Sequence, residues 1–396
     1  MSATRTTESL RPVHDRVTLV SYATLASWSW FVYGFGASLA LLRDEQGSSP
    51  TLSGLHGTSL AIGGVIGALL AARLNNRFGR GVVLRVAVIG AAAFCLLFLL
   101  PGSTIGWTLA TAFIACFFAN ICVVGVNSFI ATHQGDASPG AFTESTALAA
   151  LMGLLAPLTV GALAATVIGW RGGLVVAVIG FVAVEIARGR RVSDYGTPGH
   201  VATRRTSGGL PRLTYTALVA GMCYLGAEFC LSLWGVDLLR SQAGLSPAAA
   251  AAGLGCLTGG LFIGRVIGSR MTDRLPTERL LQGSIVAGLA CFFMVWTLSS
   301  PTFVLIAFFC TGVGLSMEWP LSVARILRSS GGRTDRASGA TLAFGTAAIA
   351  IAPFVLGALT ERIDIHQAFL IVPALLALSL AIVTVFPVPE AVATPK

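Results

Sequence analysis

Two glutamates stand out because each lies within a long apolar stretch of the sequence. Glu318 follows residues 280–317, which contain no charged residue, and Glu228 interrupts the apolar segment YLGAEFCLSLW. A carboxylate that faced hydrocarbon would be costly, so each acid is expected to face a water-filled space inside the protein. Two neighbouring carboxylates in such a space can take up a proton near neutral pH, because desolvation and mutual repulsion both oppose two negative charges. We therefore predict that Glu228 and Glu318 carry a proton during function. The alternative is that they are neutralised structural acids or only bind the substrate.

The composition indicates an integral membrane protein. Of 396 residues, 55% are hydrophobic and 11% are charged, whereas soluble domains are about 25% charged. Apolar runs of about 20 residues recur along the chain, and each is long enough to cross about 30 Å of hydrocarbon as a helix. Stretches such as LAIGGVIGALLAA do not alternate between apolar and polar residues, as the strands of a membrane barrel do. We therefore predict an all-α membrane protein.

The apolar runs predict twelve membrane-spanning helices joined by short polar loops. They are expected at about residues 17–41, 52–72, 82–101, 107–131, 142–166, 172–188, 213–239, 247–270, 280–299, 302–327, 338–360 and 367–388. Residues 1–16 form a polar, basic leader. We predict no cleaved signal peptide, because the apolar run after this leader is too long and no small-residue cleavage site follows it.

The arginines predict the orientation of these helices. If the N-terminus is cytoplasmic, the outer loops carry only Arg43, Arg171, Arg240 and Arg362, and the other basic residues lie on the cytoplasmic side. The positive-inside rule then places both termini in the cytoplasm, and we expect a multi-pass protein of the plasma membrane, the bacterial cytoplasmic membrane. This asymmetry accounts for the net charge of +9, so no nucleic-acid partner is expected. The eight cysteines lie in apolar segments without metal-knuckle spacing, and no metal site is expected.

A charged segment divides the chain in the middle. Residues 189–212 are rich in Arg, Gly, Ser and Pro and are predicted to form a cytoplasmic linker. The linker separates an N-terminal six-helix bundle, 17–188, from a C-terminal six-helix bundle, 213–388, which a short cytoplasmic tail follows, 389–396. The halves resemble each other, because LLAPLTVGALAATVIGW (154–170) aligns with AIAPFVLGALTERIDIH (350–366). Two similar bundles with a site between them are the plan of many secondary transporters.

The loop after the second span resembles a signature of the major facilitator superfamily, Gly-x-x-x-Asp-Arg-x-Gly-Arg-Arg/Lys. Arg77, Gly79 and Arg80 match it and Asn76 replaces the Asp, while the second half keeps Asp273 and Arg274 without the Gly-Arg end. The resemblance extends over almost the whole chain. It implies two six-helix bundles related by a pseudo-twofold axis around a central cavity, with these loop residues forming a cytoplasmic gate. The alternative is that the arginines only enforce the topology.

Small residues and prolines in the fifth and eleventh spans predict helix hinges. Gly153, Pro157 and Gly161 resemble the superfamily's antiporter signature, and Pro353 and Gly357 repeat the pattern in the second half. Small residues at every fourth position let helices approach closely, and a proline bends a helix and frees a carbonyl group. The pattern slightly favours an exporter, although a purely structural hinge explains it equally well.

In this superfamily the first, fourth, seventh and tenth helices line the cavity, and here each of them has polar and aromatic residues on one face. The resemblance therefore implies a substrate cavity that contains Trp30, Tyr33, Asn120, Asn127, Tyr224, Ser232, Trp319 and Ser322. Glu228 and Glu318 are expected to face the same cavity. Arg265 and Arg325 are possible ion-pair partners of these acids, although Arg325 lies two turns from Glu318 and a direct pair would need a bend. Asp237 is expected to pair locally with Arg240.

These predictions lead to a transporter rather than an enzyme. The sequence contains no nucleotide-binding or hydrolase motif, and no cofactor is expected. We predict a monomeric, proton-coupled secondary transporter of a small organic molecule that works by alternating access, as an antiporter that exports its substrate. The aromatic residues suit stacking or cation attraction. One alternative is a proton symporter that imports a sugar or another small polar nutrient, and another is a non-transporting membrane sensor or lipid-handling protein.

Overall fold

The computed structural model describes residues 12–190, 193–195, 209–271 and 274–389, and these residues form helices and short connections. Twelve segments of this part are long and apolar enough to cross a membrane, which confirms the predicted number of spans. The elements are α1 (Arg16–Gln46), α2 (Pro50–Phe78), α3 (Arg80–Phe98), α4 (Ile105–His133), η1 (Gly135–Ala137), α5 (Ser138–Ala164), α6 (Trp170–Arg188), η2 (Ser193–Tyr195), α7 (Arg212–Ala243), α8 (Pro247–Met271), α9 (Thr277–Thr297), α10 (Pro301–Leu315), α11 (Glu318–Ser329), α12 (Thr334–Thr360), α13 (Ile365–Ala368) and α14 (Ile371–Val385).

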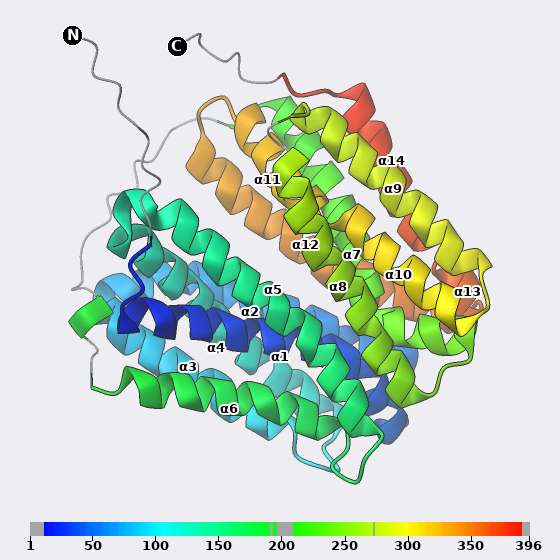
Figure 1. Cartoon of the computed structure of the whole chain (residues 1–396), viewed down its shortest axis with the longest axis horizontal. Helices are drawn as coiled ribbons and strands as arrows, with labels where there is room; N and C mark the ends of the chain where they lie inside the picture. The colour runs from blue at the N-terminus through cyan, green and yellow to red at the C-terminus, as the bar shows by residue number, and fades with distance from the viewer. Residues whose placement is uncertain (1–11, 191–192, 196–208, 272–273, 390–396) are drawn as a thin grey trace.

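The helices form two bundles that lie against each other. Figure 1 shows α1–α6, coloured blue to green, beside α7–α14, coloured green to red. The most extensive contacts between the bundles are those of α5 with α8 and of α2 with α12. We call the side where α1 begins and α14 ends the termini side, and the side where α1 ends the far side. On the predicted orientation, the termini side is the cytoplasmic side.

The sequence places helix ends where the capping chemistry requires them. Asp15 caps α1 by accepting a hydrogen bond from the Thr18 N–H, and Thr104 caps α4 in the same way through the Trp107 N–H. At the far side, α1 and α7 both end at a glycine in the left-handed conformation, Gly47 and Gly244, which avoids the strain of a Cβ atom there. These two glycines close the similar sequences LLRDEQG and LLRSQAG, so the repeat in the sequence is a repeat in structure.

Two of the glycines predicted as hinges lie where the two bundles touch. A Cβ atom on Gly161 of α5 would lie 2.3 Å from the Ala252 nitrogen of α8, and a Cβ atom on Gly357 of α12 would lie 2.9 Å from the Pro50 carbonyl oxygen of α2. The third, Gly153, packs against Tyr33 of α1 inside the N-terminal bundle. Both α5 and α12 continue through their internal prolines. These residues therefore allow close packing across the interface, and their role as hinges stays a prediction.

The tenth span is broken, which the sequence analysis did not predict. It consists of α10 and α11, with Ser316 and Met317 between them. Pro320 is the third residue of α11, and it has no N–H to donate to the Ser316 carbonyl four residues earlier. A proline in the first turn of a helix is well tolerated, so the chain ends one helix and starts another at this point. The free Ser316 carbonyl instead faces Arg265 of α8, whose Nε lies 3.4 Å from it.

Candidate functional site

A central cavity of about 250 Å³ lies between the two bundles. Residues of α1, α2, α4, α7, α8, α11 and α12 line it, so both bundles contribute to its wall. The sequence analysis named the first, fourth, seventh and tenth helices, and the structure adds α2, α8 and α12. Most of the lining side chains are apolar. The polar and aromatic ones are Trp28, Tyr33, Asn120, Glu228, Phe229, Ser232, Thr258, Trp319, Thr341 and Thr346.

The structure brings together some of the predicted cavity residues and places others elsewhere. Tyr33, Asn120, Glu228, Ser232 and Trp319 line the cavity. Trp30, Asn127, Tyr224, Glu318 and Ser322 are outside its lining. Sequence reasoning missed Trp28, Phe229, Thr258, Thr341 and Thr346.

The error on α1 concerns the choice of helical face. Trp30 packs inside the N-terminal bundle, where its indole N–H donates to the Gly173 carbonyl at 2.8 Å. The cavity is reached by Trp28, Val32 and Gly36, which are spaced by four residues and so lie on one face. This i, i+4 spacing is visible in the sequence, whereas polarity alone favours the neighbouring face that carries Trp30.

Glu228 has a defined partner behind the cavity wall. Its Oε2 lies 2.7 Å from the hydroxyl oxygen of Tyr224, and the same hydroxyl lies 2.9 Å from the Leu315 carbonyl oxygen at the end of α10. A phenol has one proton and donates one hydrogen bond at a time. Both contacts are therefore hydrogen bonds together only when Glu228 is protonated and donates to Tyr224, which then donates to Leu315. Ionised Glu228 would instead accept the hydrogen bond of the Tyr224 hydroxyl, and the Leu315 carbonyl would lose that hydrogen bond.

Arg265 connects this cluster to the N-terminal bundle. It lies within hydrogen-bonding reach of the Tyr33 hydroxyl and within electrostatic range of Glu228. Close packing of α8 positions it, because a Cβ atom on the neighbouring Gly264 would lie 2.3 Å from the Ser316 hydroxyl. Arg265 thus links the N-terminal bundle, through Tyr33, to the broken span of the C-terminal bundle.

Glu318 differs from the expectation, because it lies outside the cavity lining. It is the first residue of α11, its side chain is 0% exposed, and neither of its carboxyl oxygens has a hydrogen-bond partner among the described residues. A Cβ atom on Gly288 of α9 would lie 3.6 Å from its Oε1, so the side chain packs inside the C-terminal bundle. The expectation that Glu318 faces the cavity is therefore wrong for this conformation. Gly314, four residues earlier, packs against Gly288 as well, so the face that sequence spacing predicts is kept but is turned toward α9 and not toward the cavity.

Arg325 pairs with a different acid from the one that the sequence suggested. Its Nε lies 3.0 Å from the Glu278 Oε1 at the start of α9, and its Nη2 donates to the Phe386 carbonyl after α14. Arg328 reaches the same carboxylate at 3.5 Å. Arg325 therefore ties the termini-side ends of the C-terminal bundle together and does not pair with Glu318.

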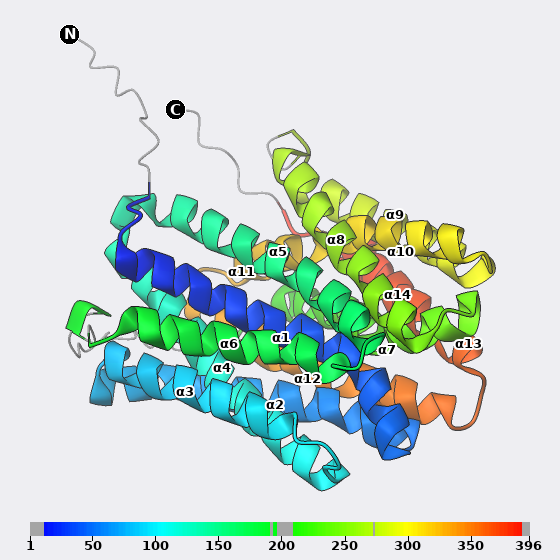
Figure 2. The same cartoon turned by 60° about the horizontal axis from the view of Figure 1, so that its bottom comes forward.

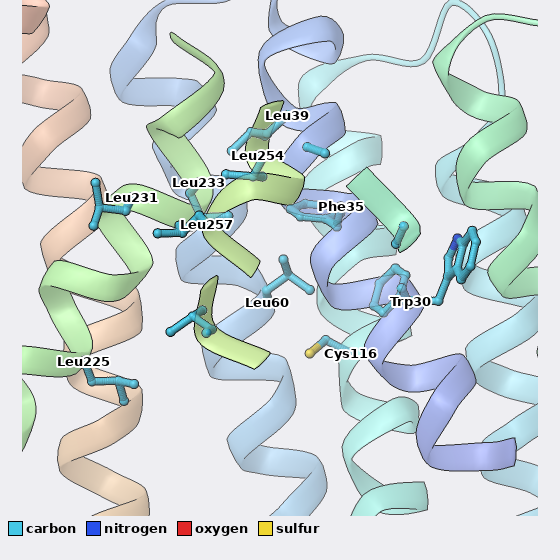
Figure 3. Packing of buried hydrophobic residues seen from close by; sticks show 14 of the residues in the cluster. Trp30, Phe35, Leu39, Leu60, Cys116, Leu225, Leu231, Leu233, Leu254 and Leu257 are labelled. Carbon is cyan, nitrogen blue, oxygen red and sulfur yellow. The ribbon is translucent and has the colours of Figure 1, made fainter. Parts of the chain in front are cut away.

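The far side of the cavity is closed by apolar side chains. Figure 3 shows Leu39 of α1, Leu60 of α2, Leu233 of α7 and Leu254 of α8, which belong to one buried cluster. A Cβ atom on Gly57 would lie 2.6 Å from the Leu233 side chain, so α2 leaves no space beside this leucine. This apolar layer lies between the cavity and the far-side ends of α1 and α7.

Two ion pairs join the bundles beyond this apolar layer. Arg43 of α1 binds Asp237 of α7 through both guanidinium nitrogens, with Nη1 to Oδ2 at 3.0 Å, and it stacks on the Trp234 ring at 5.5 Å. Arg240 of α7 binds Asp44 of α1, 2.6 Å from Nη1 to Oδ2. The expected local pair of Asp237 with Arg240 is wrong, because each aspartate pairs across the interface.

The termini side has no such connection among the residues that the structure describes. Arg80 donates to Ser128, Thr132 and the Tyr195 carbonyl, which all belong to the N-terminal half. Asn76 and Arg77 are exposed before Gly79, and Arg274 is exposed in the other half. Asp273 lies outside the described residues. The gate that the resemblance implied is thus not joined across the halves in the described part, and its role stays a prediction.

The fold and the cavity together define a class of protein. Two similar six-helix bundles enclose a site near the middle of the membrane-spanning helices, and ion pairs close only one end of it among the described residues. This is the plan of a secondary transporter that works by alternating access.

Comparison with known proteins identifies the family. A sequence model of the Major Facilitator Superfamily matches residues 19–302 and 216–396, so the chain belongs to this superfamily. It is a secondary transporter of the lipid bilayer with twelve membrane-spanning helices, and not an enzyme. A search of curated protein sequences found no match.

Solved structures confirm the fold. A mutant of the peptide transporter POT in complex with alafosfalin is similar with a TM-score of 0.75 and 14% identity, over 96% of each chain. A mutant of the nucleoside transporter NupG gives a TM-score of 0.73 and 12% identity over 94% of this chain and 98% of that one. The xylose transporter XylE from E. coli, in a partially occluded inward-open conformation, gives 0.72 and 14% over 95% and 99%.

Proposed function

We propose that this protein is a proton-coupled antiporter that exports a small organic molecule from the cytoplasm. The observation that carries the proposal is the arrangement at Glu228, a carboxylate that lines the cavity and shares the Tyr224 hydroxyl with a helix-end carbonyl. We also propose that it works as a monomer in the bacterial cytoplasmic membrane with both termini inside, which the distribution of arginines supports.

The chemistry of the cavity supports an aromatic or apolar substrate with a positive charge. Trp28, Tyr33, Phe229 and Trp319 offer aromatic surfaces for stacking or cation attraction, and Glu228 is the only acidic residue among the described residues of the lining. An ionised Glu228 attracts a cation, whereas a protonated one does not. Substrate and proton therefore compete for one carboxylate, which is the requirement for exchange.

Protonation of Glu228 also changes the broken span. When Glu228 releases its proton, Tyr224 turns its hydroxyl toward the carboxylate, and the Leu315 carbonyl loses its hydrogen bond. This carbonyl lies at the end of α10, immediately before the break at Ser316 and Met317. The charge state of a residue in the cavity is thus linked to the joint between α10 and α11.

We propose Glu318 as a second proton-binding residue. It lies within electrostatic range of Glu228, and its carboxylate has no hydrogen-bond partner in the described part of the chain. An ionised carboxylate in such surroundings costs several kcal/mol, and protonation removes this cost. A movement at the break before Glu318 would bring the side chain toward water, where it loses the proton.

Reconstituted protein tests this function. Proteoliposomes that contain the pH indicator pyranine are supplied with ethidium, an aromatic cation, or with radiolabelled xylose, a neutral polyol. We expect ethidium and protons to move in opposite directions, and Glu228→Gln to abolish the proton movement. The matched control is Glu45→Gln, because Glu45 pairs with Arg171 inside the N-terminal bundle. Proton movement in the same direction as xylose would support sugar import instead, and unchanged pH-driven transport by both Glu228→Gln and Glu318→Gln would refute proton coupling through these acids.

A further inference from the structure

A second cavity lies on the outside of the N-terminal bundle, separate from the central one. It has a volume of about 680 Å³ and lies between α1, α5 and α6. Figure 2 shows α1 running between α5 and α6, and both helices contact it. The groove runs from Arg16 at the termini-side end of α1 to Trp30 near the middle of that helix. Several of its side chains, such as Leu19 and Ala183, are exposed, so the groove opens sideways toward the surrounding lipid.

The described residues in the walls of this groove offer no free polar group except at one end. The Ser27 hydroxyl donates to the Ala23 carbonyl at 2.9 Å, and the Trp30 indole donates to the Gly173 carbonyl at 2.8 Å. The other lining side chains are apolar apart from Arg16. A water-soluble ligand would find no hydrogen-bonding partner inside such a groove, whereas a hydrocarbon chain needs none.

Arg16 supplies a positive charge at the end of the groove. Its Nε and Nη2 donate to the Ala187 carbonyl at the end of α6, at 3.0 and 2.7 Å. No carboxylate pairs with it within the described ranges, because the nearby acids have other partners: Asp15 binds His133 and Glu144 binds His14. Arg190, three residues beyond Ala187, is exposed as well. The guanidinium charge is therefore available to an anion at the membrane surface.

We propose that this groove binds one anionic phospholipid of the cytoplasmic leaflet, with an acyl chain along α1 and the phosphate group at Arg16. Trp30 lies fourteen positions after Arg16, which is about 21 Å of helix and is comparable to an extended acyl chain. A basic residue at the membrane surface, next to an intramembrane groove, is the arrangement that recognises acidic headgroups. This inference depends on the predicted orientation and not on the transported substrate.

Native mass spectrometry of the purified full-length protein tests the inference. The protein in detergent is titrated with dioleoyl phosphatidylglycerol or with dioleoyl phosphatidylcholine. We expect one site that prefers the anionic lipid, because a single arginine contributes about fivefold in affinity for one negative charge. Arg16→Gln should remove this preference, and Ala183→Phe should fill the groove and remove the binding of both lipids.

Two matched variants separate the site from general effects. Val182→Phe places the same phenyl ring at an exposed position beside Ala183 that does not line the groove, and Arg212→Gln removes an exposed arginine at the start of α7. Both should bind phosphatidylglycerol as the unmodified protein does. Unchanged anionic preference in Arg16→Gln would overturn the headgroup contact. Unchanged lipid binding in Ala183→Phe would overturn the proposed position of the acyl chain.

Discussion

At the scale of single residues, the site depends on which atom holds each proton. Glu228 lines the cavity, and its carboxyl group and the carbonyl at the end of α10 contact the same tyrosine hydroxyl. Glu318 is buried outside the cavity lining, and its carboxyl oxygens have no hydrogen-bond partner among the described residues. The two acids therefore have different environments although they belong to the same half of the molecule. In the proposed mechanism, Glu228 exchanges protons with the cavity, and Glu318 responds to a change in packing.

Tyr224→Phe tests the link between Glu228 and the broken span. The change keeps the ring and removes the hydroxyl that contacts both Glu228 and the Leu315 carbonyl. A hydrogen bond to a charged group contributes about 1.5–3 kcal/mol, so we expect the pH-driven exchange rate to fall by about tenfold or more. Flux in proteoliposomes gives the rate. Tyr215→Phe, at an exposed position of the same helix, should have no effect, and an equal loss in both variants would contradict the link.

Glu318→Met tests whether the buried acid stabilises the fold. Because neither carboxyl oxygen has a partner in the described part of the chain, an apolar side chain of similar length should leave the melting temperature unchanged or raise it. Arg325→Met should instead destabilise the protein by about 3 kcal/mol, because it leaves Glu278 largely buried without its main partner. Thermal unfolding in detergent measures both. A strong loss of stability in Glu318→Met would show that Glu318 has a structural role.

The sequence predicted which helices and which kinds of residue form this site better than it predicted which helical face points into the cavity. Twelve spans, two similar halves and a buried acid on the seventh span follow from hydropathy and from the cost of burying charge. Trp30 and Glu318 were misplaced, because helical spacing defines a face only relative to neighbouring residues and not relative to a cavity. Asp237 was misassigned because pairs across an interface leave no local pattern in the sequence.

At the scale of elements, the broken tenth span is the joint on which the proposed mechanism depends. Leu315 ends α10 beside Tyr224, and Glu318 begins α11. Arg265 of α8 reaches the carbonyl that Pro320 leaves free. Four helices, α7, α8, α10 and α11, thus meet at one irregular turn, and Pro320 enforces this irregularity.

Pro320→Ala should repair this turn. The new N–H can donate to the Ser316 carbonyl and so competes with Arg265 for this acceptor. Removing a helix-interrupting proline stabilises the fold by up to about 3 kcal/mol. We expect a higher melting temperature together with slower transport. Pro301→Ala, at the first position of α10, serves as the control, because a backbone N–H at the start of a helix has no carbonyl of the same helix to donate to. Faster transport by Pro320→Ala would contradict a role for the break.

The start of α1 predicts a pH dependence of stability. Burial of Asp15 favours its neutral form, but hydrogen bonds from Thr18 and His133 outweigh this and lower the pKa of the carboxyl below its ordinary value. A lowered pKa in the folded state stabilises the protein above the unfolded-state pKa, and this stability is lost as the pH falls below about 4. Asp15→Ala should cost about 1 kcal/mol at pH 7 and less at pH 3.

Thermal unfolding at both pH values measures this difference. The control is Thr104→Ala, which removes the cap of α4 without removing a titratable group. Its cost should be the same at the two pH values. A cost of Asp15→Ala that does not change with pH would show that the charge of Asp15 contributes nothing.

At the scale of the whole molecule, the two halves are held together on the far side. The pairs Arg43–Asp237 and Arg240–Asp44 join α1 and α7 above an apolar layer, and the arginines occupy equivalent positions in the two repeats. Opening of the far side requires both pairs to separate. Their strength therefore sets the balance between the two orientations of the cavity.

Asp237→Asn should shift this balance toward a far-side-open state. Asp237 is buried, and removing one partner of a buried pair costs about 2 kcal/mol or more, which is at least tenfold in the equilibrium. A cysteine placed at Ser232 reports opening through its reaction with a membrane-impermeant maleimide added on the far side. We expect faster labelling in Asp237→Asn and normal labelling when Arg43→Asp is combined with Asp237→Arg. Equal labelling rates in all variants would contradict a gating role.

The presence of one carboxylate in the cavity wall has an electrical consequence. Under the proposed exchange, a monovalent cation that leaves as one proton enters through Glu228 moves no net charge, so a voltage imposed with potassium and valinomycin should not drive it. If Glu318 also releases a proton in each cycle, two positive charges enter for one that leaves, and the same voltage accelerates export. The dependence of flux on membrane voltage thus counts how many of the two glutamates participate.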